Sequence, residues 1–249
     1  MRAITMRFRL TLEYDGANYA GWQLQAGQDS IQARLEAALA ALFGAPIRIY
    51  GAGRTDAGVH ATGQVAAFDA PRDFAAADLR RALNALLPPD IAIREAAATS
   101  EDFDPRRAAI ARVYEYHVLN RVTRSAFDYR YAWLVGEPLE LAAMNLAAST
   151  LIGEHDFAAF RTLGSDEQTT TRRIDSSAWR AEAGARLIYR VEATAFLRHM
   201  VRTMVALMVE IGRGKLPPAA AESILRSHDR ARAPGAAPAH GLFLVEVRY

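Results

Sequence analysis

The stretch RFRLTLEYDG, residues 7–16, alternates apolar and polar side chains over most of its length. Strict alternation predicts a β-strand with one buried face, because successive side chains of a strand point to opposite faces. The side chains expected on the buried face are Phe8, Leu10, Leu12 and Tyr14. The fold of the first half of the chain is predicted outward from this strand.

The elements that follow the first strand suggest a β-α-β-β-α-β order. Ser30 can cap the first helix and Gly44 can end it. The expected elements are a helix at 31–43, strands at 47–50 and 63–70, a helix at 74–87 and a strand at 90–99. This order is that of the ferredoxin-like, or split βαβ, arrangement. The turn-prone SEDFDPRR that follows predicts a domain boundary near residue 105.

The second half again alternates helices with strands that can pair as antiparallel hairpins. The expected elements are a strand at 111–120, a helix at 139–153, strands at 173–183 and 185–196, helices at 198–213 and after Pro218, and a strand at 241–249. We therefore predict an α+β protein with two ferredoxin-like α/β-sandwich domains and mainly antiparallel sheets. The expected domains are residues 1–105 and 106–249.

The composition is that of a globular protein from a reducing compartment. Hydrophobic residues make up 51% and charged residues 23% of the 249 residues, which is ordinary for a folded chain. Cysteine is absent, which excludes disulfides, thiolate catalysis and cysteine-ligated metals. Residues 1–10 lack the apolar core of a signal peptide, and no stretch has the length of a membrane span. We expect a cytoplasmic protein without membrane contact.

The basic residues are almost all arginines, although the net charge is only +2. Of the 30 basic residues, only Lys215 is a lysine. Arginine suits bidentate contacts with phosphate, which favours a nucleic-acid partner. A GC-rich genome, which favours arginine and alanine codons, explains the same bias. Composition alone leaves both explanations open.

The stretch GAGRTDAGVHA, residues 51–61, concentrates glycines around one arginine and one aspartate. The chain contains no GxGxxG fingerprint, P-loop, GxSxG elbow or metal-ligand spacing of its histidines, so no cofactor or metal is predicted. Asp56 remains as the candidate for chemistry. It is either a turn residue or an ionised carboxylate that acts as a nucleophile or stabilises a cation. Arg54 could pair with a phosphate or lower the pKa of Asp56, and glycines would let another molecule approach.

The string GRTDAGVHA resembles the signature of the bacterial tRNA pseudouridine synthase A family. Four other stretches, in the same order along the chain, resemble motifs of that family. They are EYDGANYAGWQLQ (13–25), NALLPPDIAI (84–93), GEHDFAAFR (153–161) and FLRHMVR (196–202). The series covers nearly the whole chain and is far more specific than any one motif.

The resemblance implies a role for four residues. Asp56 matches the catalytic nucleophile, and Arg54 matches the arginine of the same signature. Tyr114 aligns with an active-site tyrosine that stacks on or assists the target uridine, and Arg202 aligns with a basic residue that faces the aspartate. From the residues alone, Tyr114 or Tyr116 is ordinary core, and the methionines after Arg202 are packing residues. His60, in the same signature, is either a loop histidine with its own partners or an RNA contact.

The resemblance also implies the reaction and the partner. Members isomerise uridine to pseudouridine at positions 38, 39 and 40 of the tRNA anticodon stem-loop, without a cofactor. They act as homodimers, with an RNA-binding cleft between the two domains of the chain. The chain departs from the family pattern in RRAA (106–109) and at Thr203 and Ala206. These departures affect local packing and RNA contacts but not Asp56, Arg54 or Tyr114.

Two other functions use the same features. A binding module could hold structured RNA without chemistry, and only Asp56 in its glycine-rich loop distinguishes the enzyme from it. A carboxylate-based glycoside hydrolase would need a second Asp or Glu as general acid. The signature around Asp56 contains none.

Overall fold

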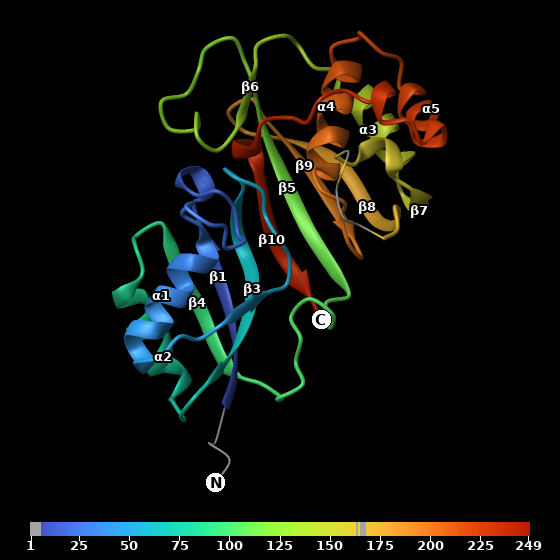
Figure 1. Ribbon diagram of the computed structural model, residues 1–249. Coiled ribbons are helices and arrows are strands. Elements are labelled where there is room, and N and C mark those ends of the chain that lie inside the picture. Colours follow the sequence, from blue (N-terminus) through green and yellow to red (C-terminus); the bar gives the residue numbers. More distant parts are fainter. Residues whose placement is uncertain (1–5, 163, 165–167) are drawn as a thin grey trace. The chain divides into compact units, whose positions relative to one another are not determined.

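The computed structural model describes residues 6–162, 164 and 168–249 (Figure 1). Within this part of the chain it forms ten β-strands and five α-helices. They fall into two compact units. Unit 1 comprises the described residues up to Ile110 together with Leu244–Tyr249, and unit 2 comprises Ala111–Phe243. The chain is thus a mixed α and β protein, and each unit is described by itself.

Unit 1 is built around its first strand, as the alternation predicted. β1 (Met6–Tyr14) pairs with β3 (His60–Ala70) and with β4 (Ile91–Ala98), and β3 also pairs with β2 (Ile49–Gly51). The strand order is therefore β4-β1-β3-β2, with every pair antiparallel. The four side chains predicted to be buried on β1 are at most 4% exposed. The half-buried strand is confirmed.

Two helices lie beside each other over the strands of unit 1 (Figure 1). α1 (Ile31–Phe43) begins where predicted, because the Ser30 side chain accepts a hydrogen bond from the backbone N–H of Ala33. It ends at Gly44, whose φ of 73° is the left-handed conformation that glycine adopts without strain. α2 spans Ala76–Leu86. Both predicted helices are confirmed, and α2 is shorter than expected.

The start of β3 differs from the prediction. The pattern placed this strand at 63–70, but pairing with β1 continues as far as Tyr14 opposite Ala61, so β3 begins at His60. A strand continues for as long as its neighbour offers hydrogen bonds, and one sequence does not show its neighbour. The last residues of the glycine-rich signature are therefore part of a strand.

Unit 2 contains a ladder of four antiparallel strands. β5 (Ala111–Asn120) pairs with β9 (Arg186–Ala193), β9 pairs with β8 (Thr171–Glu182), and β8 pairs with β7 (Gly153–Asp156). The short β6 (Trp133–Val135) pairs in parallel with β5. β6 and β7 were not predicted, since strands of three and four residues are too short to show a period.

The helices of unit 2 gather near β8 and pack on one another (Figure 1). They are α3 (Leu141–Ser149), α4 (Met200–Gly212) and α5 (Ala220–Ser227). The indole Nε1 of Trp179 on β8 donates to the Met208 sulfur on α4 at 3.2 Å. Met200, Met204 and Met208 are all 0% exposed, which confirms the prediction that they are packing residues.

The last strand, β10 (Leu242–Arg248), begins in unit 2 and continues into unit 1 from Leu244 onward. Short 3₁₀ helices occur at Gly16–Asn18, Ala158–Phe160, Arg230–Arg232 and Ala239–Gly241. Among the described helices, none combines the length and the apolar character needed to cross a membrane.

Candidate active site

The loop between β2 and β3 presents Asp56 and Arg54 at the surface of unit 1. Arg54 is exposed and Asp56 is partly exposed. The backbone carbonyl of Asp56 accepts a hydrogen bond from Val59 N–H at 3.1 Å, which closes a turn. Gly58 has a φ of 77°, as the third residue of a type II turn requires. The turn thus holds the backbone of Asp56 at a position where the residue is partly exposed.

The residues just before the turn, Gly53 and Thr55, are anchored by the protein interior. Thr55 is buried, and its hydroxyl lies 2.8 Å from the Tyr14 hydroxyl. The Thr55 carbonyl accepts a hydrogen bond from Trp22 N–H at 3.0 Å, and Gln64 Nε2 donates to the Gly53 carbonyl at 2.9 Å. Burial raises the pKa of Tyr14 to about 12, so its hydroxyl stays neutral at physiological pH. These contacts place Asp56 on a rigid support.

Two glycines of the EYDG and GWQ stretches pack directly against this loop. A Cβ on Gly21 would lie 2.5 Å from the Thr55 carbonyl oxygen, and a Cβ on Gly16 would lie 1.9 Å from that of Val59. Real Cβ atoms do not approach this closely, so only glycine fits without moving the loop. The motif at residues 13–25 therefore positions the Asp56 loop.

The NALLPPDIAI stretch is tied to the same region through Asp90. The Tyr19 hydroxyl donates to the Asp90 carboxylate at 2.6 Å, and the Asp90 carbonyl accepts from Asp15 N–H at 2.9 Å. The Tyr19 carbonyl in turn accepts a hydrogen bond from Gly58 N–H at 3.4 Å. Three stretches that are distant in sequence thus meet around Asp56. Sequence reasoning named the motifs but missed the supporting roles of Tyr14, Tyr19, Gln64 and Asp90.

His60 follows the turn as the first residue of β3 and is 1% exposed. Its Nδ1 accepts a hydrogen bond from Gly16 N–H at 3.1 Å, and the Asp15 carboxylate lies 3.0 Å from the same nitrogen. A buried ring that accepts a hydrogen bond from the backbone has a structural role, since RNA cannot reach it. The structure therefore favours the first of the two alternatives for His60.

The other two predicted residues belong to unit 2. Tyr114 on β5 is 8% exposed, and its ring meets the Phe196 ring edge-on with the centroids 5.1 Å apart. Tyr116 is 0% exposed and its hydroxyl donates to the Pro238 carbonyl at 2.8 Å. Tyr116 is thus a core residue, as expected for at least one of this pair. Tyr114 has a small accessible surface.

Arg202 lies in the first turn of α4 and is partly exposed. Its Nε donates to the Ala237 carbonyl at 2.7 Å, and Ala237 N–H donates back to the Arg202 carbonyl at 3.0 Å. These two bonds orient the guanidinium through its Nε. Arg202 therefore has a packing role in addition to any substrate contact.

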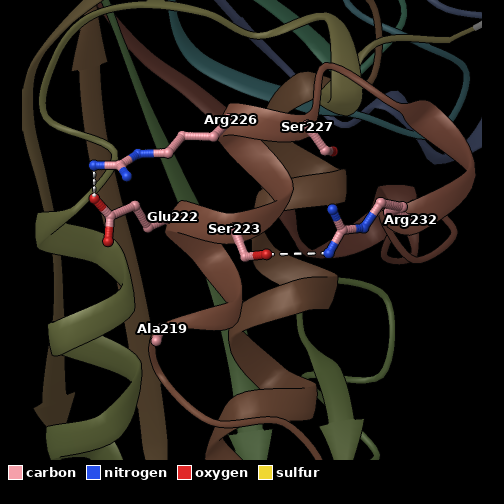
Figure 2. A pocket seen from close by; sticks show the side chains of 6 residues that line it. All are labelled: Ala219, Glu222, Ser223, Arg226, Ser227 and Arg232. Atoms are coloured by element: carbon pink, nitrogen blue, oxygen red, sulfur yellow. Dashed lines mark hydrogen bonds and ion pairs between the residues drawn. The ribbon is translucent and has the colours of Figure 1, made fainter.

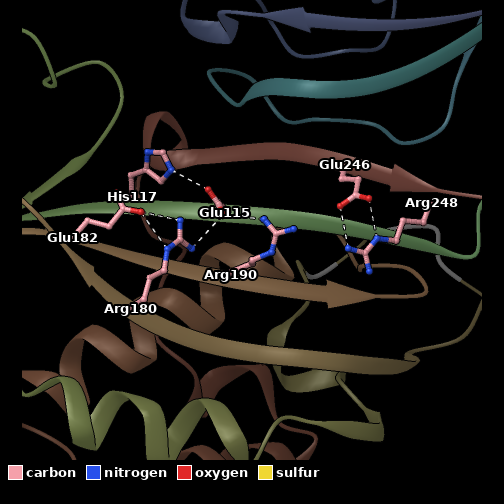
Figure 3. A network of polar contacts seen from close by, with 7 residues as sticks. All are labelled: Glu115, His117, Arg180, Glu182, Arg190, Glu246 and Arg248. Atoms are coloured by element: carbon pink, nitrogen blue, oxygen red, sulfur yellow. Dashed lines mark hydrogen bonds and ion pairs between the residues drawn. The ribbon is translucent and has the colours of Figure 1, made fainter.

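A charged network connects three strands of unit 2 (Figure 3). One of its members, Glu115, is the residue that follows Tyr114 in the sequence. Glu115 on β5 pairs with Arg190 on β9 at 2.9 Å and with Arg180 on β8 at 3.2 Å. Burial alone would raise the pKa of the Glu115 carboxyl, but the two arginines outweigh it and the pKa is lowered. Because side chains alternate along a strand, this network lies on the face of β5 opposite Tyr114. It braces the strand that carries Tyr114.

A shallow pocket on α5 contains none of the predicted site residues (Figure 2). Its lining is Ala219, Glu222, Ser223, Arg226, Ser227 and Arg232. Arg226 pairs with Glu222 at 2.6 Å and Arg232 donates to the Ser223 hydroxyl at 3.0 Å. Both arginines of this pocket are therefore engaged by other residues of its lining. Within the described residues, no cluster of three or more His, Asp or Glu residues is placed to hold a metal ion.

Comparison with known proteins shows to which family the chain belongs. The tRNA pseudouridine synthase family profile matches residues 11–106 and 147–249, which together form most of the chain. The chain belongs to the tRNA pseudouridine synthase family. The matched ranges include Arg54, Asp56 and Arg202, whereas Tyr114 lies between them.

Full-length relatives support the same family over the whole chain. A protein of Myxococcus xanthus is 46% identical over 98% of this chain and 92% of its own length. A protein of Geobacter sulfurreducens is 46% identical over 97% of this chain and 98% of its own length. A protein of Fervidobacterium nodosum is 40% identical over the full length of both chains. All three are named tRNA pseudouridine synthase A. The chain is accordingly an isomerase that converts uridine in tRNA to pseudouridine.

Proposed function

We propose that the chain isomerises uridines 38, 39 and 40 of the tRNA anticodon stem-loop, with Asp56 as the nucleophile. The observation that carries this proposal is the Asp56 loop. Its flanking residue Thr55 is buried, whereas Asp56 is partly exposed, and the loop lies within the matched family profile. A hydrogen-bonded backbone that carries a partly exposed aspartate suits attack on a bound substrate.

The reaction breaks the bond between the sugar C1′ and N1 of uracil and forms a bond between C1′ and C5. The proton lost from C5 is matched by one gained at N1, so no redox partner or group donor is needed. Asp56 either bonds to C1′ or stabilises the positive charge that develops on the sugar. The base must leave the RNA stack to be reached, which requires flipping of the nucleotide.

The remaining predicted residues bind the substrate. Arg54, exposed two residues before Asp56, is suited to a phosphate of the flipped nucleotide. Tyr114 would stack on the uracil or assist proton transfer, and stacking on one base contributes roughly 1–3 kcal/mol. Arg202 would face the catalytic carboxylate. Because one site must serve three neighbouring uridines, phosphate and shape contacts should dominate over base reading.

The proposed architecture is two ferredoxin-like domains, residues 1–105 with the Asp56 loop and residues 106–249 with Tyr114 and Arg202. The β4-β1-β3-β2 order of unit 1, with α1 and α2 over its strands, supports this arrangement for the first domain. We also propose a homodimer that acts on tRNA in the cytoplasm.

Incubation of the purified chain with uridine-labelled tRNA, without cofactor or metal, is expected to produce pseudouridine at positions 38–40. Mapping of the modified positions is the measurement. A chain that binds tRNA but forms no pseudouridine would be a binding module, and release of free uracil would indicate a glycoside hydrolase. Either result would contradict the proposal.

Substitution of Tyr114 separates stacking from chemistry. Tyr114→Phe keeps the ring and its edge-on contact with Phe196, so we expect normal tRNA affinity with a slower rate of pseudouridine formation. Tyr114→Leu should lower both. The measurements are the dissociation constant for tRNA and the single-turnover rate. Full activity of the Phe variant would assign Tyr114 to stacking alone, and full activity of the Leu variant would make it a core residue.

A further inference from the structure

The segment between β5 and β6, residues 121–131, exposes large apolar side chains. We name it the 121–131 loop; it leaves the end of β5 and returns at β6 (Figure 1). Phe127 is 87%, Val122 84% and Tyr129 62% exposed. Exposed apolar residues are common singly, but a group in one short loop indicates a contact surface. The proposed catalytic and binding residues include none of them.

The same loop is positively charged. Arg121 and Arg124 are exposed, and Arg130 is partly exposed. The only acidic residue of the loop is Asp128, which forms an ion pair with Arg186 at 2.6 Å, so arginines outnumber acidic residues in the loop. Interleaved arginines and exposed rings are typical of surfaces that bind single-stranded RNA, where arginines contact phosphates and rings stack on bases.

Hydrogen bonds within the loop and at its base support its conformation. Ser125 is 8% exposed, and its hydroxyl accepts hydrogen bonds from the N–H groups of Phe127 and Asp128, at 3.3 and 3.0 Å. The Asp128 carbonyl accepts from Tyr131 N–H at 2.8 Å. At the base of the loop, Asn120 Nδ2 donates to the Val135 carbonyl at 2.9 Å. The backbone that carries Phe127 is therefore supported by hydrogen bonds, which lowers the entropy lost on binding.

We propose that the 121–131 loop is a second RNA-contact surface, where an unpaired base of the tRNA stacks on Phe127 and Arg121 and Arg124 bind the flanking phosphates. This rests on the proposed function, which makes tRNA the substrate. From Tyr114 to Asn120, the last residue of β5 before the loop, the strand rises six residues, about 20 Å at the usual rise per residue. The loop therefore contacts a nucleotide other than the target uridine.

A second copy of the chain fits this surface less well than RNA. A two-fold interface centred on the loop would bring the arginines of both copies together, and like charges that face each other oppose association. RNA supplies the opposite charge to the arginines and a flat partner to the ring. The charge of the loop thus favours RNA as the occupant.

The ring at position 127 is tested by tRNA affinity. Phe127→Ala should weaken tRNA binding at least about fivefold, the lower end of what one stacked base contributes. Phe127→Leu should also weaken it, because leucine is apolar but cannot stack, whereas Phe127→Trp should retain affinity. The matched control is Leu146→Ala on α3, where Leu146 is 60% exposed, and its affinity should not change. Unchanged affinity of the Ala and Leu variants would overturn the proposal.

The arginines are tested by the salt dependence of tRNA binding. Each phosphate contact that is lost should reduce the slope of log affinity against log salt by slightly less than one unit. Arg121→Gln and Arg124→Gln are each expected to reduce the slope. Arg226→Gln, at a side chain that is 77% exposed and paired with Glu222, should leave the slope unchanged. Equal slopes for all three variants and the unaltered chain would contradict the phosphate contacts.

The occupant is identified by photo-crosslinking from a photoreactive phenylalanine analogue at position 127. An adduct with tRNA supports the proposal, whereas an adduct with a second copy of the chain, or no adduct, overturns it. Pseudouridine formation by the unaltered chain is measured in parallel. If the chain is active but Phe127 is irrelevant to binding, the loop proposal fails and the proposed function stands. If binding depends on Phe127 but no pseudouridine forms, the loop proposal stands and the proposed function fails.

Discussion

Asp56→Asn is expected to abolish pseudouridine formation while the chain folds normally and still binds tRNA. Asparagine has the size of aspartate and can take its place in the turn that Val59 N–H closes on the Asp56 carbonyl. It lacks the charge that attack on the sugar, or stabilisation of a sugar cation, requires. We therefore expect no detectable product, an unfolding temperature close to that of the unaltered chain, and nearly unchanged affinity for tRNA.

The control for this substitution is Asp73→Asn, which removes the same charge from an exposed residue of unit 1. It should leave the rate of pseudouridine formation unchanged. Product, melting temperature and tRNA affinity are measured together for both variants. Substantial pseudouridine formation by the Asp56 variant would exclude Asp56 as the nucleophile, and a large loss of stability would assign it to the turn instead.

Gly21→Ala is expected to cost both stability and activity, because it acts on the backbone next to Asp56. Gly21 has a φ of 101°, where a side chain is strained, and a Cβ there would lie 2.5 Å from the Thr55 carbonyl oxygen. Strain of this kind costs about 1–3 kcal/mol, and relief of the clash must move Thr55. A displacement of the reacting group by about 1 Å can reduce the rate about a hundredfold. We expect a loss of about 3 kcal/mol in the free energy of unfolding and at least a hundredfold slower rate.

Gly27→Ala is the matched control in the same region of unit 1. Gly27 also has a positive φ, 72°, but no atom lies within 4 Å of the position of its Cβ. This variant should lose about 1 kcal/mol through backbone strain and keep its rate. Denaturant unfolding and single-turnover rates compare the two variants. Equal effects would show that the contact with Thr55 does not position Asp56.

Regular local patterns in the sequence predicted the regular elements well. The alternation in residues 7–16 predicted β1 and its buried face, and Ser30 with Gly44 predicted both ends of α1. The prediction was less accurate where pairing with a neighbouring strand decides whether a strand forms and where it begins. β3 is extended by its partner β1, and β6 and β7 exist because longer strands lie beside them. Such pairing depends on residues far away in the chain, which a local pattern does not contain.

The sequence by itself determined the family and the candidate residue, because GRTDAGVHA and four other motifs occur in order and Asp56 is the one carboxylate in the signature. Only the tertiary structure decided how the loop is held. It places Tyr14 on the Thr55 hydroxyl, packs Gly21 against the Thr55 carbonyl and buries His60. These contacts join residues more than thirty positions apart. Packing and hydrogen bonds form between neighbours in space, and a single sequence specifies those neighbours only through the folded chain.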